Sequence, residues 1–246
     1  MLQDILNCYR TVDPHVSVDC VLIGYDGNQL CTLLVKQQGA VDDGNYSYMK
    51  LPGSLIFIDE DLDEAARRVL MELTGLKSVP LLQFKAFGDK DRVKNPRDQK
   101  WLRRFHSLNQ TAERIVSIGY LSLLRIDRKY EQLTDLYEAK WCPIKEVGNL
   151  AFDHNQMLTE ALKYIRQYVE LNPSALFDLL PRKFTAAQLR TLFDLVYDKV
   201  FDIRNFHKRI SQMPYVVPLD EKEVGVAHRA ARYYKFDKTI YNKTHR

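Results

Sequence analysis

The sequence has little cysteine, and its cysteines follow no pattern typical of a metal site or a disulfide framework. Four cysteines are spread over 246 residues, with no Cys-x-x-Cys pair. Zinc sites and disulfide frameworks both need clustered or regularly spaced cysteines. We therefore expect ordinary reduced thiols, no metal site and no cofactor.

Long hydrophobic runs are also missing. No stretch of about 18 apolar residues occurs, and residues 1–20 lack the basic start and apolar core of a signal peptide. These absences argue against membrane-spanning and secreted proteins, and we expect a cytoplasmic protein with no membrane partner. What remains is ordinary globular composition, 46% hydrophobic and 28% charged, in a chain long enough for two domains.

Positive charge is unevenly distributed. The net charge is +4, and all of the basic excess lies from Phe177 onward, after a slightly acidic first part. Such asymmetry favours nucleic-acid binding by one end of the chain. It also fits a merely solvated surface, so the motifs must decide between the two.

The first half contains several strand patterns. Val16–Ile23 and Thr32–Lys36 flank Asp26-Gly27-Asn28, which is a hairpin turn signal. His154–Leu171 has apolar residues on one side and ends before a proline, which predicts a helix that joins the two halves. Residues 89–110 are polar and basic without a clear period, so we expect a loop or a partly ordered insertion there. The further strand candidates are Leu51–Ile58, Leu81–Phe87, Ile115–Ile126 and Leu136–Cys142.

The segment Leu51–Leu76 resembles the signature of the Nudix superfamily. That signature combines a glycine, an early glutamate and a later Arg-Glu-aliphatic-x-Glu-Glu-x-Gly core. Counted back from Gly75, the resemblance places Arg68 on the signature arginine. It also places Glu72 on the first glutamate of the late pair and Glu60 on the early glutamate.

A second register, counted forward from Gly53, matches Asp59 and Arg67 instead. We prefer the first register, in which Val69 and Leu73 replace two acids of a set spaced i, i+3, i+4. Three acids at that spacing would share one helix face and hold divalent cations against a diphosphate. In either register two of the three carboxylates are missing, so we expect no catalytic residues and no hydrolysis.

Two other interpretations of this segment stay open. A plain amphipathic helix would have a core stripe of Leu62, Ala65, Ala66, Val69, Leu70 and Leu73. An active Nudix hydrolase of nucleoside diphosphate derivatives would need Glu60 and Glu72, aided by Asp59 or Asp61, to hold the metal.

The C-terminal part predicts a winged helix-turn-helix. Thr185 begins a capping box, completed by a glutamine three positions on and followed by apolar residues at helical spacing. Asp202 is a good N-cap for a basic helix over Ile203–Gln212, and Tyr215–Pro218 and Arg232–Phe236 are strand candidates. Helix, turn, basic helix and hairpin form the winged layout. The expected buried stripe of the basic helix is Ile203, Phe206, Ile210 and Met213.

The polar face of the basic helix suits DNA. Arginine can fork onto guanine and asparagine onto adenine, while lysine and histidine approach phosphates. Wing arginines could reach the backbone or the minor groove. A winged helix can also be a protein-interaction module, and that alternative leaves this face without a nucleic-acid role. The predicted DNA contacts are Arg204, Asn205, His207, Lys208, Arg209, Arg229 and Arg232.

Together the two halves resemble the Nudix-related transcriptional regulators, in which a Nudix-like effector domain precedes a winged helix. Leu179–Ile210 and Gly225–Phe236 carry most of this resemblance. Phe152–Met157 and Val69–Leu76 look closer to the sugar-responsive, AraR-type branch than to the branch that senses ADP-ribose compounds. The resemblance implies an α+β protein with an α/β/α sandwich at residues 1–171, a winged helix at 172–246, and a homodimer built through the Nudix-like domains.

We therefore predict a ligand-responsive repressor of genes for the use of a sugar, such as the pentose arabinose. Its partners would be a double-stranded DNA operator and a small effector, either a sugar or, as second choice, an ADP-ribose-like nucleotide. The degenerate Nudix domain would be the sensor. The effector site is placed coarsely at Gly53, Glu60, Glu72, Asp89, Asp91 and Arg92.

Overall fold

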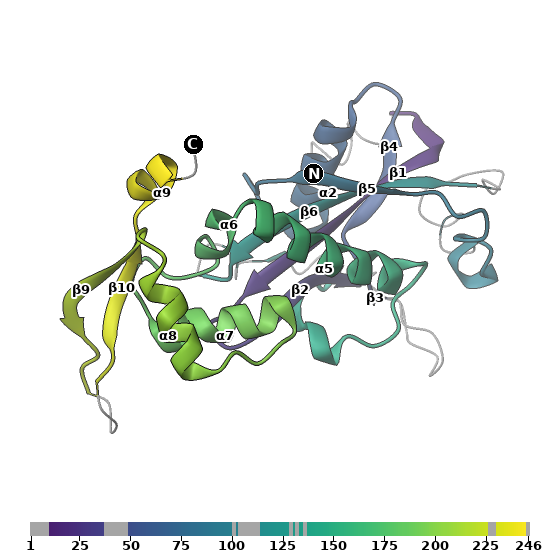
Figure 1. The fold of residues 1–246 in the computed structure, drawn as a ribbon. Helices are drawn as coiled ribbons and strands as arrows, with labels where there is room; N and C mark the ends of the chain where they lie inside the picture. The colour runs from purple at the N-terminus through teal and green to yellow at the C-terminus, as the bar shows by residue number, and fades with distance from the viewer. Residues whose placement is uncertain are drawn as a thin grey trace. The chain divides into compact units, whose positions relative to one another are not determined.

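The computed structural model describes residues 10–36, 49–99, 102, 114–127, 130, 133–134, 137–225 and 230–244 (Figure 1). These residues form two compact units. The first takes in the chain up to Ile23 together with 32–122 and 128–161, and the second takes in 24–31, 123–127 and the chain from Leu162. Within the described ranges, no helix is both long and apolar enough to cross a membrane.

A sheet with the strand order β3-β2-β1-β6-β5 forms the base of the first unit, with β4 paired to β1 and β7 paired to β2. Burial on both sides explains the apolar run in the middle of this sheet, where Val18–Tyr25 is buried throughout. The strands are β1 (Val12–Tyr25), β2 (Leu30–Lys36), β3 (Met49–Lys50), β4 (Gly53–Phe57), β5 (Leu82–Phe87), β6 (Val116–Arg125) and β7 (Lys140–Pro143).

The turn between β1 and β2 confirms the predicted hairpin. The Asp26 carboxylate accepts the backbone N–H of Asn28 at 2.7 Å and that of Gln29 at 2.9 Å. Gly27 has φ 104°, a value that favours glycine. The strand expected at Leu136–Cys142 was too long, because Glu138 has φ 45° and extended structure begins only at Lys140; Leu136 lies outside the described residues.

Helix α2 (Leu62–Thr74) follows β4 and is the helix of the Nudix-like segment. Asp61 and Glu64 form a capping box at its start, and Gly75 ends it with φ 77°. The predicted core stripe is largely confirmed, since Leu62 and Leu73 are only half-buried while its other members are buried. The short helix η2 (Ile144–Glu146) and helix α5 (His154–Leu171) follow β7, and α5 has the predicted bounds.

Of the two predictions for residues 89–110, a loop or a partly ordered insertion, the described residues fit the second. Residues 96–99 are helical, and the Asp98 side chain is buried and accepts the backbone N–H of Phe152 at 3.2 Å. Arg92 is also buried. Residues 100–101 and 103–110 lie outside the described part of the chain.

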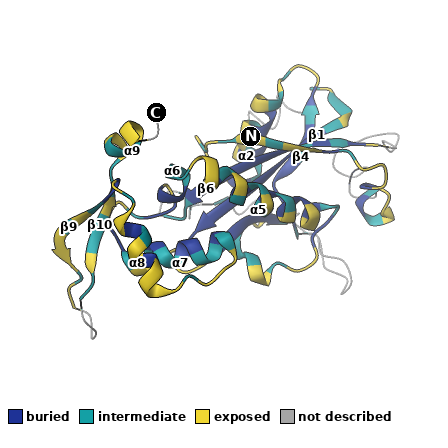
Figure 2. Cartoon of the chain, in the orientation of Figure 1, coloured by how far each residue is buried: buried dark blue, intermediate teal, exposed yellow. Residues whose placement is uncertain are grey.

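The second unit contains the predicted winged helix. A three-stranded sheet has the order β8-β10-β9, and Phe193, Phe206 and Ile210 are buried in the helical core. Figure 2 shows the opposite side of α8 as exposed. The elements are α6 (Ser174–Phe177), β8 (Phe184–Thr185), α7 (Ala186–Tyr197), α8 (Ile203–Ser211), β9 (Val216–Lys222), β10 (Arg232–Phe236) and α9 (Lys238–Thr244).

One core prediction for this unit is wrong. Ile203 is 58% exposed, although it lies on the same side of α8 as buried Phe206. The ring of Phe201, in the turn before α8, packs 6.0 Å from the ring of Phe206 and 6.1 Å from that of Phe193. Phe201, and not Ile203, therefore packs against this aromatic core. The last stripe member, Met213, is half-buried.

Candidate functional site

Arg68 binds both signature glutamates, Glu72 in α2 and Glu60 in the loop before this helix. Its guanidinium lies 2.6 Å from Glu60 Oε1 and 3.0 Å from Glu72 Oε2. The Glu60 side chain is 5% exposed and also accepts the backbone N–H of Phe57 at 2.9 Å. The Arg68 guanidinium lies 4.2 Å from the centre of the Phe57 ring. This cluster ties the loop to the helix.

Such a cluster is poorly suited to hold a metal ion. Divalent cations in diphosphate sites need several carboxylate oxygens, whereas here each glutamate is paired with a guanidinium. Val69 is fully buried, so its position faces the core of the unit. Within the described ranges, no group of three or more His, Cys, Asp or Glu side chains is arranged to hold a metal ion.

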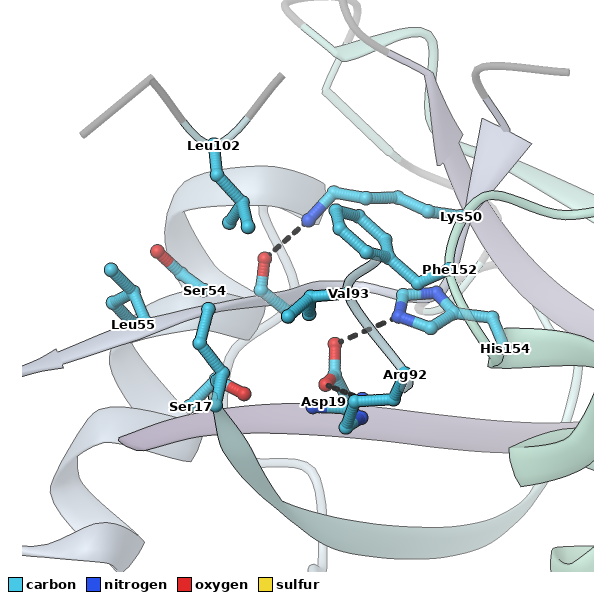
Figure 3. Close-up of a pocket in the computed structure, with 12 residues that line it drawn as sticks. Ser17, Asp19, Lys50, Ser54, Leu55, Arg92, Val93, Leu102, Phe152 and His154 are labelled. Carbon is cyan, nitrogen blue, oxygen red and sulfur yellow. Dashed lines mark hydrogen bonds and ion pairs between the residues drawn. The ribbon is translucent and has the colours of Figure 1, made fainter. Parts of the chain in front are cut away.

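A polar cavity of about 40 Å³ lies elsewhere in the first unit, between β1, β3, β4, the turn after β5 and the start of α5 (Figure 3). Its volume corresponds to a few water molecules. One side is apolar and is formed by Leu55, Val93, Leu102 and Ile115. The polar lining side chains are Ser17, Asp19, Lys50, Ser54, Arg92 and His154.

Asp19 is at the centre of the polar side. Its side chain is 7% exposed, and it accepts a short hydrogen bond from the Ser117 hydroxyl. Arg92 Nη2 lies 3.8 Å from Asp19 Oδ2, and His154 Nε2 lies 3.4 Å from Asp19 Oδ1 (Figure 3). A buried carboxylate needs such partners, because burial without them would cost several kcal/mol.

The imidazole of His154 is neutral and has a defined tautomer. The backbone N–H of Leu51 donates to Nδ1 at 2.9 Å, so the ring proton is on Nε2, which faces Asp19. Desolvation by burial lowers the pKa of His154 to about 4 against the opposing effect of Asp19. His154 therefore places an uncharged ring with its Nε2 3.4 Å from the Asp19 carboxylate near neutral pH.

Lys50 supplies a buried amine to the same cavity. Its Nζ donates to the carbonyl of Gly53, and burial lowers the pKa of Lys50 to about 8 although Asp19 opposes the shift. Gly53 leaves no room for a side chain, since a Cβ at this position would lie 1.7 Å from Asp19 Oδ1. Close approach, and not backbone conformation, requires glycine here.

The predicted effector residues separate into three groups. Gly53 and Arg92 line the cavity. Glu60 and Glu72 lie around Arg68 instead. Asp89 and Asp91 lie in the turn after β5, where Asp91 pairs with Lys90 at 3.1 Å.

Sequence reasoning missed Asp19, Lys50 and His154, which come from distant parts of the chain. One available signal was Asp19, an acid inside an otherwise apolar buried strand. Buried acids of this kind are rare unless they are paired, so the position predicts a partner. Nothing in the local pattern around Lys50 or His154 identifies those partners.

The structure places most of the predicted DNA contacts on exposed surface of the second unit. Arg204, Asn205, His207 and Lys208 are exposed on α8, and Arg232 is exposed on β10. Arg209 is half-buried, with its guanidinium 4.9 Å from the centre of the Phe193 ring and 5.5 Å from that of Phe201. Arg209 thus packs on the aromatic core. Arg229 lies outside the described residues.

The fold and these sites define a protein with a Nudix-fold unit and a winged-helix unit. Residues 13–161 match the NUDIX domain family, and the chain belongs to that family. Residues 176–236 match the NrtR DNA-binding winged helix domain. The expected α+β architecture, with its N-terminal Nudix fold and C-terminal winged helix, is confirmed.

Several relatives share both parts. The chain is 24% identical to the ADPR responsive transcriptional repressor NtrR of Acinetobacter baylyi, over 91% of this chain and 82% of the relative. The crystal structure of Shewanella oneidensis NrtR complexed with a 27mer DNA matches with TM-score 0.65 and 24% identity, over 90% of this chain and 93% of that chain. A MutT/nudix family protein from Enterococcus faecalis matches with TM-score 0.57 and 21% identity, over 96% and 94%.

These structural likenesses show the fold. The expected closeness to the sugar-responsive, AraR-type branch finds no support among these relatives, since the one described by its effector is ADPR responsive. Two short segments suggested the sugar branch, Phe152–Met157 and Val69–Leu76. Both contain residues of the hydrophobic core. Val69 and Met157 are both fully buried.

Proposed function

We propose that this chain is a ligand-responsive, DNA-binding transcriptional repressor, with the Nudix unit as sensor and the winged helix as DNA reader. The observation that carries this proposal is the exposed polar face of α8, where Arg204, Asn205, His207 and Lys208 lie opposite the buried Phe206 and Ile210. Residues of these types read base edges and phosphates. The match to a DNA-binding winged-helix family supports the same assignment.

The sensor is proposed to bind without catalysis. A metal-dependent pyrophosphatase needs several carboxylates on one helix face, but Glu60 and Glu72 are paired with Arg68. We propose the division at 171/172 between sensor and reader because α5 ends at Leu171, just before Pro173.

We propose the polar cavity as the effector site. Its cationic groups, Lys50 and Arg92, suit a phosphate, and Asp19 suits sugar hydroxyls. The cavity is partly open and has room for only a few water-sized groups, so it would receive one end of a nucleotide. The ADPR-responsive relative favours an ADP-ribose-like nucleotide over a free pentose such as arabinose.

A DNA-binding titration tests the function. The wild-type protein selects duplexes from a random pool, and fluorescence anisotropy then measures affinity with and without ADP-ribose or L-arabinose. An effector that prefers one state of the protein must change DNA affinity. We expect ADP-ribose to change it and arabinose to leave it unchanged. If the protein selects no duplex, the proposed repressor function is wrong. If only arabinose changes the DNA affinity, the function stands and only the proposed effector is wrong.

Variants link the response to the cavity. Lys50→Gln should abolish the effect of ADP-ribose and leave DNA affinity without effector unchanged, because Lys50 is far from α8 in sequence and belongs to the other unit. Exposed Lys77 offers a matched control, and Lys77→Gln should respond like the wild type. Equal responses in both variants would place the effector elsewhere.

We also propose a homodimer that binds an inverted repeat. Two-fold symmetric regulators place two recognition helices on half-sites related by the same axis. Light scattering should give twice the monomer mass of 28.8 kDa, and selected duplexes should contain a repeated half-site. A monomer that protects a single unrepeated site would contradict this.

A further inference from the structure

A groove of about 530 Å³ opens in the winged-helix unit between the start of α7, the side of α8 and the wing, which is formed by strands β9 and β10. Its alanines are residues 186–187 and 230–231, whose small side chains let another molecule approach the backbone. Four longer side chains border it, namely His207 from α8, Lys222 from the end of β9, and Arg232 and Tyr234 from β10. Figure 1 shows α8 beside the base of the wing.

Lys222 and Arg232 face each other across the wing. They are direct partners in the antiparallel pairing of β9 with β10, and both are exposed. Like charges directly opposite in a sheet are destabilising. The arrangement therefore has a cost in the free protein that a bound anion would remove.

Two acids lie in the sequence beside Lys222, and neither is among the residues that line the groove. Glu221 pairs with Lys183 at 2.6 Å. The Glu223 carboxylate accepts the backbone N–H of Ala231 at 3.1 Å. Within the described residues, neither Lys222 nor Arg232 forms an ion pair with an acidic side chain, and the residues that line the groove include these two cations and no acid.

The start of α7 also borders the groove. The capping box between Thr185 and Gln188 satisfies the N–H groups of those two residues. Ala186 and Ala187 are the first two residues of the helix, where N–H groups have no partner within the helix. Both residues line the groove, so the positive end of the α7 dipole lies beside the cationic side chains.

We infer that this groove holds a phosphate group of the DNA backbone between Lys222, Arg232 and His207. The inference rests on the proposed DNA binding and assigns Lys222 a role that the helix pattern did not indicate. A phosphate contact of this kind fixes how the protein sits on the duplex and carries no sequence information. Base readout then belongs to Arg204 and Asn205 on α8.

Salt dependence of DNA binding tests the inference. Lys222→Gln/Arg232→Gln removes both cations, and Lys235→Gln/Lys238→Gln removes two lysines of the same unit outside the groove. Fluorescence anisotropy gives affinity at several KCl concentrations for a duplex selected by the wild type and for a random duplex. Each lost phosphate contact should lower the slope of log affinity against log salt by about 0.9. We expect this loss on both duplexes for the groove variant, and the wild-type slope for the control.

A chemically neutral backbone locates the contact. Methylphosphonate replaces one phosphate at a time in the selected duplex, and at one position per half-site the wild type should lose affinity. The groove variant should show no further loss at that position, while the control variant should lose affinity as the wild type does. Without DNA, the groove variant should unfold at the wild-type temperature or above it, because a repulsive pair is gone.

Two outcomes overturn the inference in distinguishable ways. If the groove variant keeps the wild-type slope, or if the control loses as much, the groove holds no phosphate although DNA binding stands. If the wild type itself binds neither duplex, the proposed function fails and the groove assignment fails with it.

Discussion

Arg92 and Asp153 form a largely buried ion pair, with Arg92 Nη2 2.8 Å from Asp153 Oδ1, although 61 positions separate them in the sequence. The Arg92 side chain is 3% exposed and also lies 3.8 Å from Asp19 Oδ2. One guanidinium thus balances two buried carboxylates, one from the middle of the sheet and one beside the start of α5. The polar cavity depends on this pairing.

Removal of Arg92 should therefore destabilise the Nudix unit strongly. Arg92→Ala leaves Asp19 and Asp153 buried without their cation, which typically costs about 3–5 kcal/mol. Urea denaturation followed by tryptophan fluorescence measures the change. Lys94→Ala is the control, because Lys94 has a side chain 62% exposed and should change stability by less than about 0.5 kcal/mol. Equal effects of the two variants would contradict the ion-pair network.

Gly53→Ala should destabilise the protein through a collision with Asp19. The added Cβ would lie 1.7 Å from Asp19 Oδ1, so β1 and β4 must separate or the carboxylate must leave its partners. Overpacking of this kind costs about 1–3 kcal/mol. Gly148→Ala is the matched control, since nothing lies within 4 Å of a Cβ there. Thermal unfolding of both variants tests the difference.

Stability should fall in acid through the protonation of His154. Its pKa is about 4 in the folded protein against 6.5 for an unperturbed histidine. The unfolded chain therefore binds more protons between these values, and the contribution is complete above pH 6.5 and is lost as the pH falls towards 4. The full effect is roughly 3 kcal/mol. His154→Gln should show a flatter dependence of unfolding free energy on pH, and an unchanged slope would refute the assignment.

The protein should not hydrolyse ADP-ribose, NADH or sugar nucleotides with Mg²⁺ or Mn²⁺. Arg68 pairs with both Glu60 and Glu72, so the metal would have to displace a guanidinium. Chromatography of the released phosphate or nucleotide measures turnover. A rate near the typical enzyme value of about 10 per second that Glu72→Gln abolishes would show an active hydrolase instead.

The arginines of α8 should divide into two kinds. Arg204→Ala and Asn205→Ala should each weaken binding to a selected duplex by about 1–3 kcal/mol. Arg209→Ala should mainly lower stability, by about 0.5–2 kcal/mol, because its guanidinium packs on Phe193 and Phe201. Anisotropy and thermal unfolding of each variant separate these effects. If the double change Arg204→Ala/Lys208→Ala leaves affinity intact in a folded protein, α8 does not read DNA.

Much of the fold follows from local patterns in the sequence. The capping boxes at Asp61 and Thr185, the turn at Asp26-Gly27-Asn28 and the period of α5 each act within a few residues. Local hydrogen bonds and side-chain periodicity determine such elements, so single-sequence reasoning reaches them. The two retained signature glutamates, Glu72 in α2 and Glu60 just before it, were visible in the same way.

Only the tertiary structure decided which residues meet at the sites. Asp19, Arg92 and His154 come together because β1, the turn after β5 and the start of α5 converge. Periodicity assigned Ile203 to the core, but Phe201, and not Ile203, packs against the aromatic core. The sequence by itself determined the elements and the type of chemistry that each surface carries. Packing decided the partners, because a buried charge is matched by whichever opposite charge the fold brings near, however distant along the chain.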